Sequence, residues 1–164
     1  MKDPAPSRRK TLARSKPRVQ YGALPYRLSP QLEILLVTSR ETGRWVIPKG
    51  WPIRLKSRRK VAALEALEEA GVEGRVGKEP LGEFGYLKVL RSGENQACRV
   101  TVFALEVLTQ RDAWREQAQR SVQWFGWEEA AAAVQEPGLS QIILDFARGV
   151  PPEPDAIGRS RSKG

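Results

Sequence analysis

The sequence predicts one mixed α/β domain, in which helices pack in layers against a mixed sheet. Some segments are rich in β-branched and aromatic residues and are either continuously apolar or alternate between apolar and polar residues, as strands do. Segments of helical composition lie between them. The chain has 164 residues, a length that suits one compact domain. We expect a flexible basic arm over residues 1–17, the folded domain over residues 18–149 and a flexible tail over residues 150–164.

Each element is predicted from its composition and from the turn residues beside it. The predicted strands cover residues 19–28, 32–39, 45–47, 82–90 and 99–108. The predicted helices cover residues 61–70, 127–134 and 140–147. Ser29-Pro30 separates the first two strands, and Pro137-Gly138 separates the last two helices. Gly71 follows the first helix, where a left-handed C-terminal cap is common.

The composition restricts the chemistry that the protein can use. The chain contains no histidine, which excludes Ser-His-Asp and Cys-His triads and every histidine metal site. Its single cysteine, Cys98, cannot form an internal disulfide, and we expect it to be a small apolar residue inside a strand. Catalysis would therefore depend on carboxylates, on lysines or on a metal held by oxygen atoms.

The net charge of +9 is concentrated at the two ends of the chain. Residues 1–17 hold six basic residues and one acidic residue, whereas residues 18–149 hold 19 basic and 16 acidic residues. The arm could bind nucleic acid, although it lacks aromatic residues for base stacking. No apolar run is long enough to cross a bilayer, and there is no secretory signal, so we expect a cytoplasmic protein without a membrane partner. The Arg- and Ser-bearing start is also typical of organelle transit peptides, but no amphipathic helix is evident there.

The most informative segment covers residues 50–72 and reads GWPIRLKSRRKVAALEALEEAGV. At about 100° per residue, one side of its helix carries the small and apolar residues Ala63, Ala66, Leu67 and Ala70, and the other side carries Glu65, Glu68 and Glu69. Neighbouring carboxylates repel one another, and a divalent cation such as Mg²⁺ would relieve this repulsion. The alternative is a solvated acidic surface.

This segment resembles the signature of the Nudix hydrolases, written G-x5-E-x7-R-E-U-x-E-E-x-G-U, where U is a bulky aliphatic residue. The matching positions are Gly50, Glu65, Glu68, Glu69, Gly71 and Val72, with the smaller Ala66 at an aliphatic position. Lys56 stands where the first glutamate belongs, and Leu64 stands where the arginine belongs. The strand before Gly50 and the Trp124-Phe125 pair before the Glu-Glu-Ala helix are similar to the family as well, so the resemblance covers roughly residues 19–148.

The resemblance implies a three-layer α/β/α sandwich and a magnesium-dependent hydrolase of phosphoanhydride bonds, with manganese as a second candidate metal. Carried over by position, Glu65, Glu68 and Glu69 would be catalytic and would bind the metal, together with the backbone carbonyl of Gly50. Because Lys56 and Leu64 remove both partners of the family's arginine–glutamate pair, neither charge is left buried alone. The fold can therefore tolerate the change more easily than catalysis can.

The overall likeness is to hydrolases of diphosphoinositol polyphosphates and of diadenosine polyphosphates, which implies a small, highly phosphorylated substrate. The residues that would bind its phosphates are Arg27, Ser39, Arg40, Arg44 and Lys49. The basic residues before the helix are either a solvated loop or a further contact for the anionic substrate. Two other functions stay open: a Nudix-like module that binds a phosphorylated ligand without cleaving it, and a nucleic-acid-binding protein that acts on RNA 5′ ends.

Overall fold

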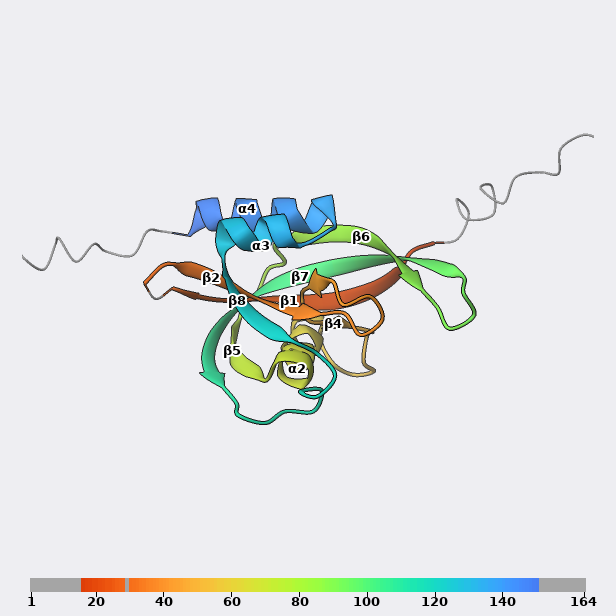
Figure 1. Ribbon diagram of the computed structural model, residues 1–164, viewed down its shortest axis with the longest axis horizontal. Helices are drawn as coiled ribbons and strands as arrows, with labels where there is room; N and C mark the ends of the chain where they lie inside the picture. The colour runs from red at the N-terminus through yellow and green to blue at the C-terminus, as the bar shows by residue number, and fades with distance from the viewer. Residues whose placement is uncertain (1–15, 29, 151–164) are drawn as a thin grey trace, which may run out of the picture.

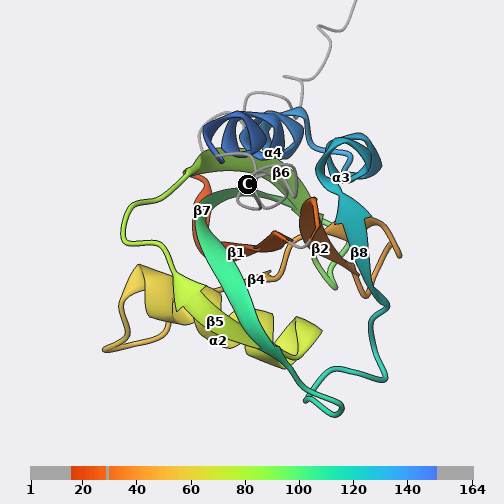
Figure 2. The ribbon, with the colours of Figure 1, turned by 90° about the vertical axis from the view of Figure 1, so that its left-hand side faces the viewer.

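The computed structural model describes residues 16–28 and 30–150, which form a mixed sheet with helices on both faces (Figure 1). Helix α2 (Arg58–Ala70) covers one face of the sheet. Helices α3 (Trp127–Ala133) and α4 (Pro137–Gly149) cover the other face (Figure 2). This arrangement confirms the predicted mixed α/β class and the sandwich architecture.

The sheet is built around strand β1 (Arg18–Leu28), which pairs in parallel with β7 (Asn95–Gln110) and antiparallel with β2 (Leu32–Thr38). The shorter neighbours are β3 (Trp45–Val46), β4 (Lys49–Gly50), β5 (Val72–Val76), β6 (Gly82–Val89) and β8 (Val122–Gly126). Strands β5 and β6 pair with β7, β3 and β8 pair with β2, and β4 pairs with β1. The short β4 matters for function, because it fixes the segment before helix α2 to the middle of the sheet.

Side chains on the central strands alternate between two cores, one beneath each helical layer. On β2, Ile34 and Leu36 point toward α3 and α4, whereas Leu35 and Val37 point toward α2. All four side chains are fully buried. The apolar β2 segment is therefore a strand with two covered faces, which explains why it reads as a continuous apolar run.

Strands β1 and β7 and helices α2 and α4 are longer than predicted, whereas β2, β3, β6 and α3 each end one residue earlier. Pro137 and Gly138, which were predicted to separate the last two helices, are the first two residues of α4. Helix α2 begins at Arg58, because the hydroxyl of Ser57 caps it by accepting a hydrogen bond from the backbone N–H of Lys60 at 3.3 Å. Helix α4 begins at Pro137, which fits the first turn of a helix because proline has no N–H to leave unpaired. Cys98 is buried within β7, as expected.

The predicted basic arm and tail lie almost entirely outside the described residues, so their flexibility stays a prediction. Among the described helices, none combines the length and the hydropathy that a membrane span requires.

Candidate active site

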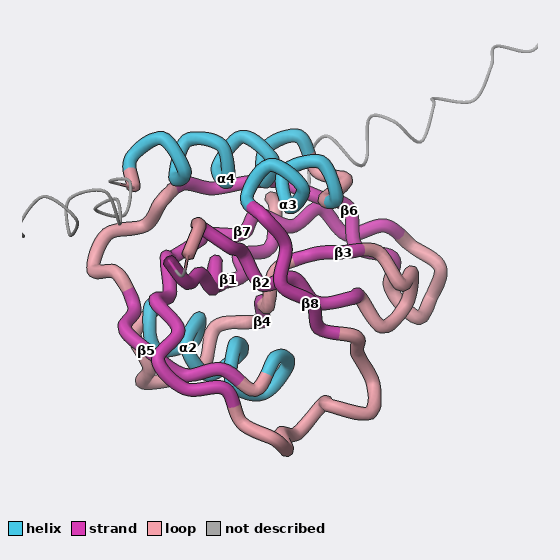
Figure 3. Tube along the Cα trace, turned by 60° about the vertical axis from the view of Figure 1, so that its left-hand side comes forward, coloured by secondary structure: helices cyan, strands magenta, loops and turns pink. Residues whose placement is uncertain are grey.

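Helix α2 and strand β4 together fix the position of the signature glutamates. The helix packs its small residues Ala62, Ala66 and Ala70 into the core on the α2 side of the sheet, so its opposite edge faces outward. It ends at Gly71, which adopts a left-handed backbone with φ of 69°. Strand β4 pairs Gly50 with Tyr21 of β1, which holds the signature loop beside the helix (Figure 3).

Glu65 lies directly against the backbone of Gly50. A Cβ atom placed on Gly50 would overlap with the carboxylate of Glu65, so only glycine leaves room for this side chain. Burial, joined by the negative charges of Glu68 and Glu116, raises the pKa of Glu65 to about 7. At neutral pH this carboxyl group can therefore both accept and release a proton.

Glu69, one helical turn further on, is the most buried acid of the site, with only 5% of the residue exposed. Its carboxylate accepts hydrogen bonds from the backbone N–H of Lys49 at 3.3 Å and from Arg120 Nη2 at 3.2 Å. Burial raises its pKa to about 8, and the positive charges of Arg120 and Lys49 offset only part of this effect. Glu65 and Glu69 thus form a pair of partly desolvated carboxyl groups beside β4.

Glu68 lies at the edge of this pair and is turned toward the surface. Its side chain is 36% exposed and forms an ion pair with Arg115, with Nη1 and Oε1 separated by 3.2 Å. The structure therefore brings Glu65 and Glu69 together, whereas Glu68, the third predicted glutamate, pairs with Arg115.

This β7–β8 loop, residues 111–121, brings two charged side chains to the candidate site, Glu116 and Arg120, which the sequence pattern did not reveal. It passes the C-terminal end of α2 (Figure 3), where the backbone N–H of Glu116 donates to the carbonyl of Glu68 at 3.0 Å. Arg120 is 10% exposed and reaches Glu69 at 3.2 Å and Glu116 at 3.5 Å. It also donates to the carbonyl of Thr38 at 3.0 Å. A buried guanidinium thus links strand β2, the loop and the glutamate helix.

The donor chemistry of this site fits a divalent cation that is held by two carboxylates. Within residues 16–28 and 30–150, no three acidic, cysteine or histidine side chains are grouped closely enough to hold a metal ion by themselves. Mg²⁺ does not require such a group, because it binds one or two carboxylates and completes its shell with waters and substrate phosphates. The raised pKa values of Glu65 and Glu69 indicate two carboxyl groups that would ionise more easily beside a further positive charge.

Three of the predicted phosphate-binding residues, Ser39, Arg44 and Lys49, line a cavity of about 80 Å³, whereas Glu65 and Glu69 are not part of its wall. The cavity lies between the turn after β2 and strand β6, from which Lys88 and Tyr86 join its wall. Burial lowers the pKa of Lys49, whose ammonium group lies 4.9 Å from the centroid of the Tyr86 ring. Lys49 connects the glutamate pair with this cavity, because its backbone N–H donates to Glu69 while its side chain lines the cavity.

The other two predicted phosphate-binding residues lie elsewhere. Arg40 contacts Glu116 at 3.5 Å, so it lies on the outer side of the β7–β8 loop. Arg27 is near the far end of β1, where it pairs with Glu33 at 2.9 Å and its guanidinium carbon lies 4.1 Å from the centroid of the Trp124 ring. It is not among the residues that line the cavity.

One of the basic residues at the start of α2, Arg59, is directed toward strand β5. Arg59 donates to the carbonyl of Val76 in β5 at 3.0 Å, on the side of the helix away from β4. Leu64, which replaces the signature arginine, also lies on this side, in a hollow that it shares with Leu105. Its apolar contacts explain how the helix accepts leucine at this position.

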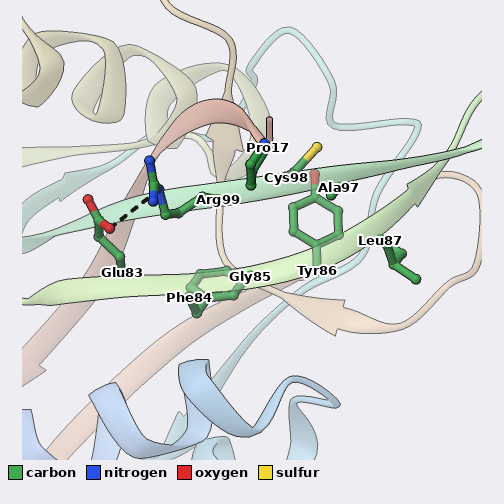
Figure 4. Close-up of a pocket in the computed structure, with 9 residues that line it drawn as sticks. All are labelled: Pro17, Glu83, Phe84, Gly85, Tyr86, Leu87, Ala97, Cys98 and Arg99. Atoms are coloured by element: carbon green, nitrogen blue, oxygen red, sulfur yellow. Dashed lines mark ion pairs between the residues drawn. The ribbon is translucent and has the colours of Figure 1, made fainter. Parts of the chain in front are cut away.

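A larger and shallower hollow of about 530 Å³ lies over strands β6 and β7 (Figure 4). Its wall is mostly apolar, and its charged residues Glu83 and Arg99 form an ion pair with 3.5 Å between Oε2 and Nε. Because these charges neutralise each other, this hollow offers much less to an anionic substrate than the smaller cavity beside Lys49.

Comparisons with known proteins agree with this geometry, although no family model matches the chain. The chain is 31% identical over 131 residues to "Nudix hydrolase 17, mitochondrial" of Arabidopsis thaliana, an alignment that covers 74% of this chain and 69% of the relative. It is 30% identical over 117 residues to "Diphosphoinositol polyphosphate phosphohydrolase 3-alpha" of Mus musculus, covering 70% of this chain and 67% of that protein.

Solved structures show the same fold at lower sequence identity. An Ap4A hydrolase of C. elegans, in a binary complex, aligns with a TM-score of 0.60 and 18% identity over 80% of this chain and 96% of that one. The NUDIX domain of Shewanella oneidensis NrtR, complexed with ADP ribose, aligns with a TM-score of 0.61 and 17% identity over 88% and 99% of the two chains. The sequence relatives, together with the glutamate helix and the shared fold, show that this chain belongs to the Nudix hydrolase family.

Proposed function

We propose that this protein is a Mg²⁺-dependent hydrolase that cleaves phosphoanhydride bonds in a small, highly phosphorylated substrate. The observation that carries the proposal is the pair Glu65 and Glu69, of which Glu69 is buried, together with Lys49, which contacts Glu69 and lines a cavity with Arg44 and Lys88. Carboxylates can hold a cation, and the cations of the cavity can hold phosphate groups at the same time. This combination suits a substrate that carries several phosphates in a row.

In this proposal Glu65 and Glu69 hold the metal, and the backbone carbonyl of Gly50 and the carboxylate of Glu68 supply further oxygen atoms. When bound, Mg²⁺ would neutralise phosphate oxygens and lower the pKa of a coordinated water. Glu68 would first have to leave Arg115, a separation that costs little because the Arg115 side chain is 77% exposed. Mn²⁺ has similar oxygen preferences and is the alternative metal.

Glu65 is the group that we assign to move the proton of the attacking water. In the metal-free protein the pKa of Glu65 is about 7, and a bound Mg²⁺ would lower it, so that the carboxylate would be ionised and able to accept a proton from the water. Because Gly50 has no Cβ, the carboxylate of Glu65 can lie directly against the signature loop. Glu69, held by Lys49 and Arg120, is the more rigid of the two and suits the role of principal ligand.

The side chains of Arg44 and Lys49 would position the phosphates next to this pair. Arginine presents a planar set of donors that fits phosphate oxygens, while lysine provides a compact charge. Because burial lowers the pKa of Lys49, a phosphate that comes close would strengthen the charged form of this residue. Binding of the substrate and full charging of Lys49 would therefore support each other.

Turnover on a panel of substrates tests the proposal directly. Purified protein is incubated with Mg²⁺ and diphosphoinositol phosphates, dinucleoside polyphosphates or nucleoside triphosphates, and the released phosphate products are measured. Glu69→Gln should lower kcat on the best substrate by at least about 100-fold, whereas Glu73→Gln should leave it unchanged. Glu73 is the matched control because it pairs with Arg111 on the exposed side of β5. Full turnover by Glu69→Gln would disprove the metal-binding role.

A second candidate is a Nudix-fold module that binds a phosphorylated ligand without cleaving it. The observation that favours it is Arg120, whose guanidinium already lies between Glu69 and Glu116 and so provides positive charge without a metal. For such a module, ligands of the same panel would raise the melting temperature while no product forms under any metal condition.

We further propose that the folded domain covers residues 18–149 and that the protein works in the cytoplasm. Six relatives carry the word mitochondrial or chloroplastic in their names, so the location of the protein should be tested in cells. A fluorescent fusion at the C-terminus should give diffuse staining, and staining confined to organelles would contradict this proposal.

A further inference from the structure

Residues 51–60 lead from β4 into the first turn of α2 and form a basic loop with five cations and no acidic residue. The cations are Arg54, Lys56, Arg58, Arg59 and Lys60. Within the described part of the chain, eight arginines form ion pairs with carboxylates, but none of these five cations does. Cations in the first turn of a helix also oppose its dipole. Their positions therefore do not stabilise the fold, and an anionic partner would offset the repulsion between them.

Leu55, in the middle of the basic loop, combines an exposed side chain with an unusual backbone. The residue is 97% exposed, and its φ of 67° lies in the left-handed region. No other non-glycine residue of the described ranges has a positive φ. Glycine would avoid both the backbone strain and the exposure of apolar surface to water. Ile53, two residues earlier, is also partly exposed, so aliphatic side chains alternate with cations along this segment.

A neighbouring cation extends the positive charge of the basic loop onto strand β5. A shallow hollow of about 470 Å³ is lined by Arg59 and Lys60 on the helix and by Arg75 on the strand. Arg75, like the cations of the loop, forms no ion pair with a described carboxylate. Arg59 donates to the carbonyl of Val76 at 3.0 Å, which fixes its position without neutralising its charge. In Figure 2 the loop before α2 lies at the outer edge of the molecule, on the side opposite α3 and α4.

The basic start of the chain joins the fold beside the same loop. The guanidinium carbon of Arg18, the first residue of β1, lies 4.2 Å from the centroid of the Trp51 ring. The sequence of residues 1–17, which precedes it, holds six basic residues and one acidic residue. Two basic segments therefore join the fold at neighbouring places.

We propose that the basic loop binds the surface of a membrane that contains anionic phospholipids. Its cations would lie against the headgroup phosphates, and Leu55 would enter the apolar boundary beneath them. The crowded cations and the exposed leucine, which are unfavourable in water, would both be favourable at such a surface. The contact is peripheral and reversible, so it requires no membrane span. The expectation that the protein has no membrane partner rests on the absence of a span and does not apply to a peripheral contact.

A dissolved polyanion explains less of the same surface. Polyphosphate or nucleic acid would pair with the cations but would leave Leu55 in water. Proteins that bind single-stranded nucleic acid also stack bases on aromatic rings. Trp51 is the only aromatic residue of the basic loop, and it is half-buried with Arg18 against its ring. A bilayer uses the cations and the leucine together.

Membrane binding and the proposed hydrolysis use different faces of α2. Lys60 and Ala63 line the basic hollow, whereas Glu65 and Glu69 lie beside β4 on the other side of the helix. The inference therefore goes beyond the proposed function and does not depend on it.

Co-sedimentation with phospholipid vesicles tests the inference on the full-length protein. Vesicles of phosphatidylcholine are compared with vesicles that also contain phosphatidylglycerol, in EDTA so that no metal bridges protein and lipid. We expect binding only to the anionic vesicles, with a partition constant that falls as the salt concentration rises. Leu55→Gly should lower this constant by about tenfold, because the leucine side chain leaves water in the bound state. Leu28→Ser, at the opposite end of β1 from Arg18, is the control and should leave it unchanged.

A double variant tests the charge of the basic loop. Arg54→Gln combined with Lys56→Gln should lower the partition constant by about 30-fold, because each cation near an anionic surface contributes separately. The matched control combines Arg111→Gln with Arg115→Gln, which removes the same charge from exposed residues of the β7–β8 loop. This control should change the constant by less than about threefold.

Urea denaturation separates a loss of binding from a loss of folding. Leu55→Gly should be at least as stable as the wild type, because glycine adopts a φ of 67° without strain. Weaker vesicle binding by this variant then reflects the lost side chain.

Three results would overturn the inference: neutral vesicles that bind as tightly as anionic ones, a Leu55→Gly variant that binds like the wild type, or equal losses for the two double variants. Polyphosphate or single-stranded RNA that binds to the same cations, without any binding to vesicles, would assign the basic loop to a dissolved polyanion and would also overturn it. Turnover plays no part in these measurements, so their outcome and that of the Glu69→Gln test are distinguishable.

Discussion

Replacing Glu69 by glutamine should stabilise the metal-free protein at alkaline pH while it abolishes turnover. Burial raises the pKa of this carboxyl group from the ordinary value of 4.5 to about 8, although Arg120 and Lys49 lie beside it. Between these two pH values the folded protein holds a proton that the unfolded chain has already released. The free energy of unfolding therefore falls as the pH rises through this window, and the full penalty is present above about pH 8.

The size of the effect follows from the two pKa values. At about 1.36 kcal/mol per pKa unit, the difference between 4.5 and about 8 corresponds to at most about 5 kcal/mol once Glu69 is fully ionised. The free energy of unfolding of the wild type should fall by about 2–3 kcal/mol between pH 6 and pH 8.5, because the folded-state pKa of Glu69 lies within that interval. Glutamine has no charge to ionise, so the Glu69→Gln variant escapes this part of the loss.

Urea denaturation in EDTA at pH 6 and pH 8.5 measures the effect for the wild type, for Glu69→Gln and for the surface control Glu73→Gln. The wild type and the control should lose stability with pH more steeply than Glu69→Gln. Added Mg²⁺ should restore the wild type at pH 8.5 and leave Glu69→Gln unchanged, since a bound cation stabilises only the protein that holds it. The reasoning is refuted if all three proteins show the same pH dependence, or if Glu69→Gln is the least stable at both pH values.

Two further substitutions test the geometry around the glutamates. Gly50→Ala places a methyl group where the Glu65 carboxylate lies, so kcat should fall by about 10- to 100-fold. Gly126→Ala is the control and should leave initial rates unchanged, because the new methyl group lies in open space. Equal rates for both variants would show that the position of Glu65 does not matter. Arg120→Ala should cost about 3–5 kcal/mol in urea denaturation, because it leaves buried acids without their partner. Arg115→Ala, which removes an exposed ion pair, should cost less than about 1 kcal/mol, and similar costs for the two arginine variants would contradict the structural role of Arg120.

Much of the fold can be predicted from the sequence because its long elements have strong periodic patterns. Strand β1 was predicted to within one residue, since it is rich in apolar and aromatic residues, with only Gln20, Gly22 and Arg27 between them, and a predicted turn follows it. Strands β4 and β5 were missed, and strand β8 was indicated only by the family resemblance around Trp124-Phe125. Strand β4 has only two residues, and β5 contains Gly74 and Arg75, which carry no strand pattern of their own. Pairing with β1 and β7 determines these strands, and such long-range pairing leaves no local signature.

Some residues of the candidate site could likewise be predicted from the sequence, and others could not. Glu65 and Glu69 could be predicted, because a helix places residues four apart on one face. The sequence did not predict three other residues. Glu116 and Arg120 lie in an irregular loop, and Glu136, which lines the cavity with Lys49, has the pattern of an ordinary acidic residue before a helix. Only the folded chain brings Arg120 to within 3.2 Å of Glu69, which is 51 residues away in the sequence.

The most direct test of the central claim is the anomalous diffraction signal of a crystal that has been soaked in Mn²⁺. We expect a single strong site in contact with the carboxylates of both Glu65 and Glu69, close to the backbone of Gly50. A manganese site elsewhere, or a well-diffracting crystal in which these two carboxylates bind no ion, would contradict it.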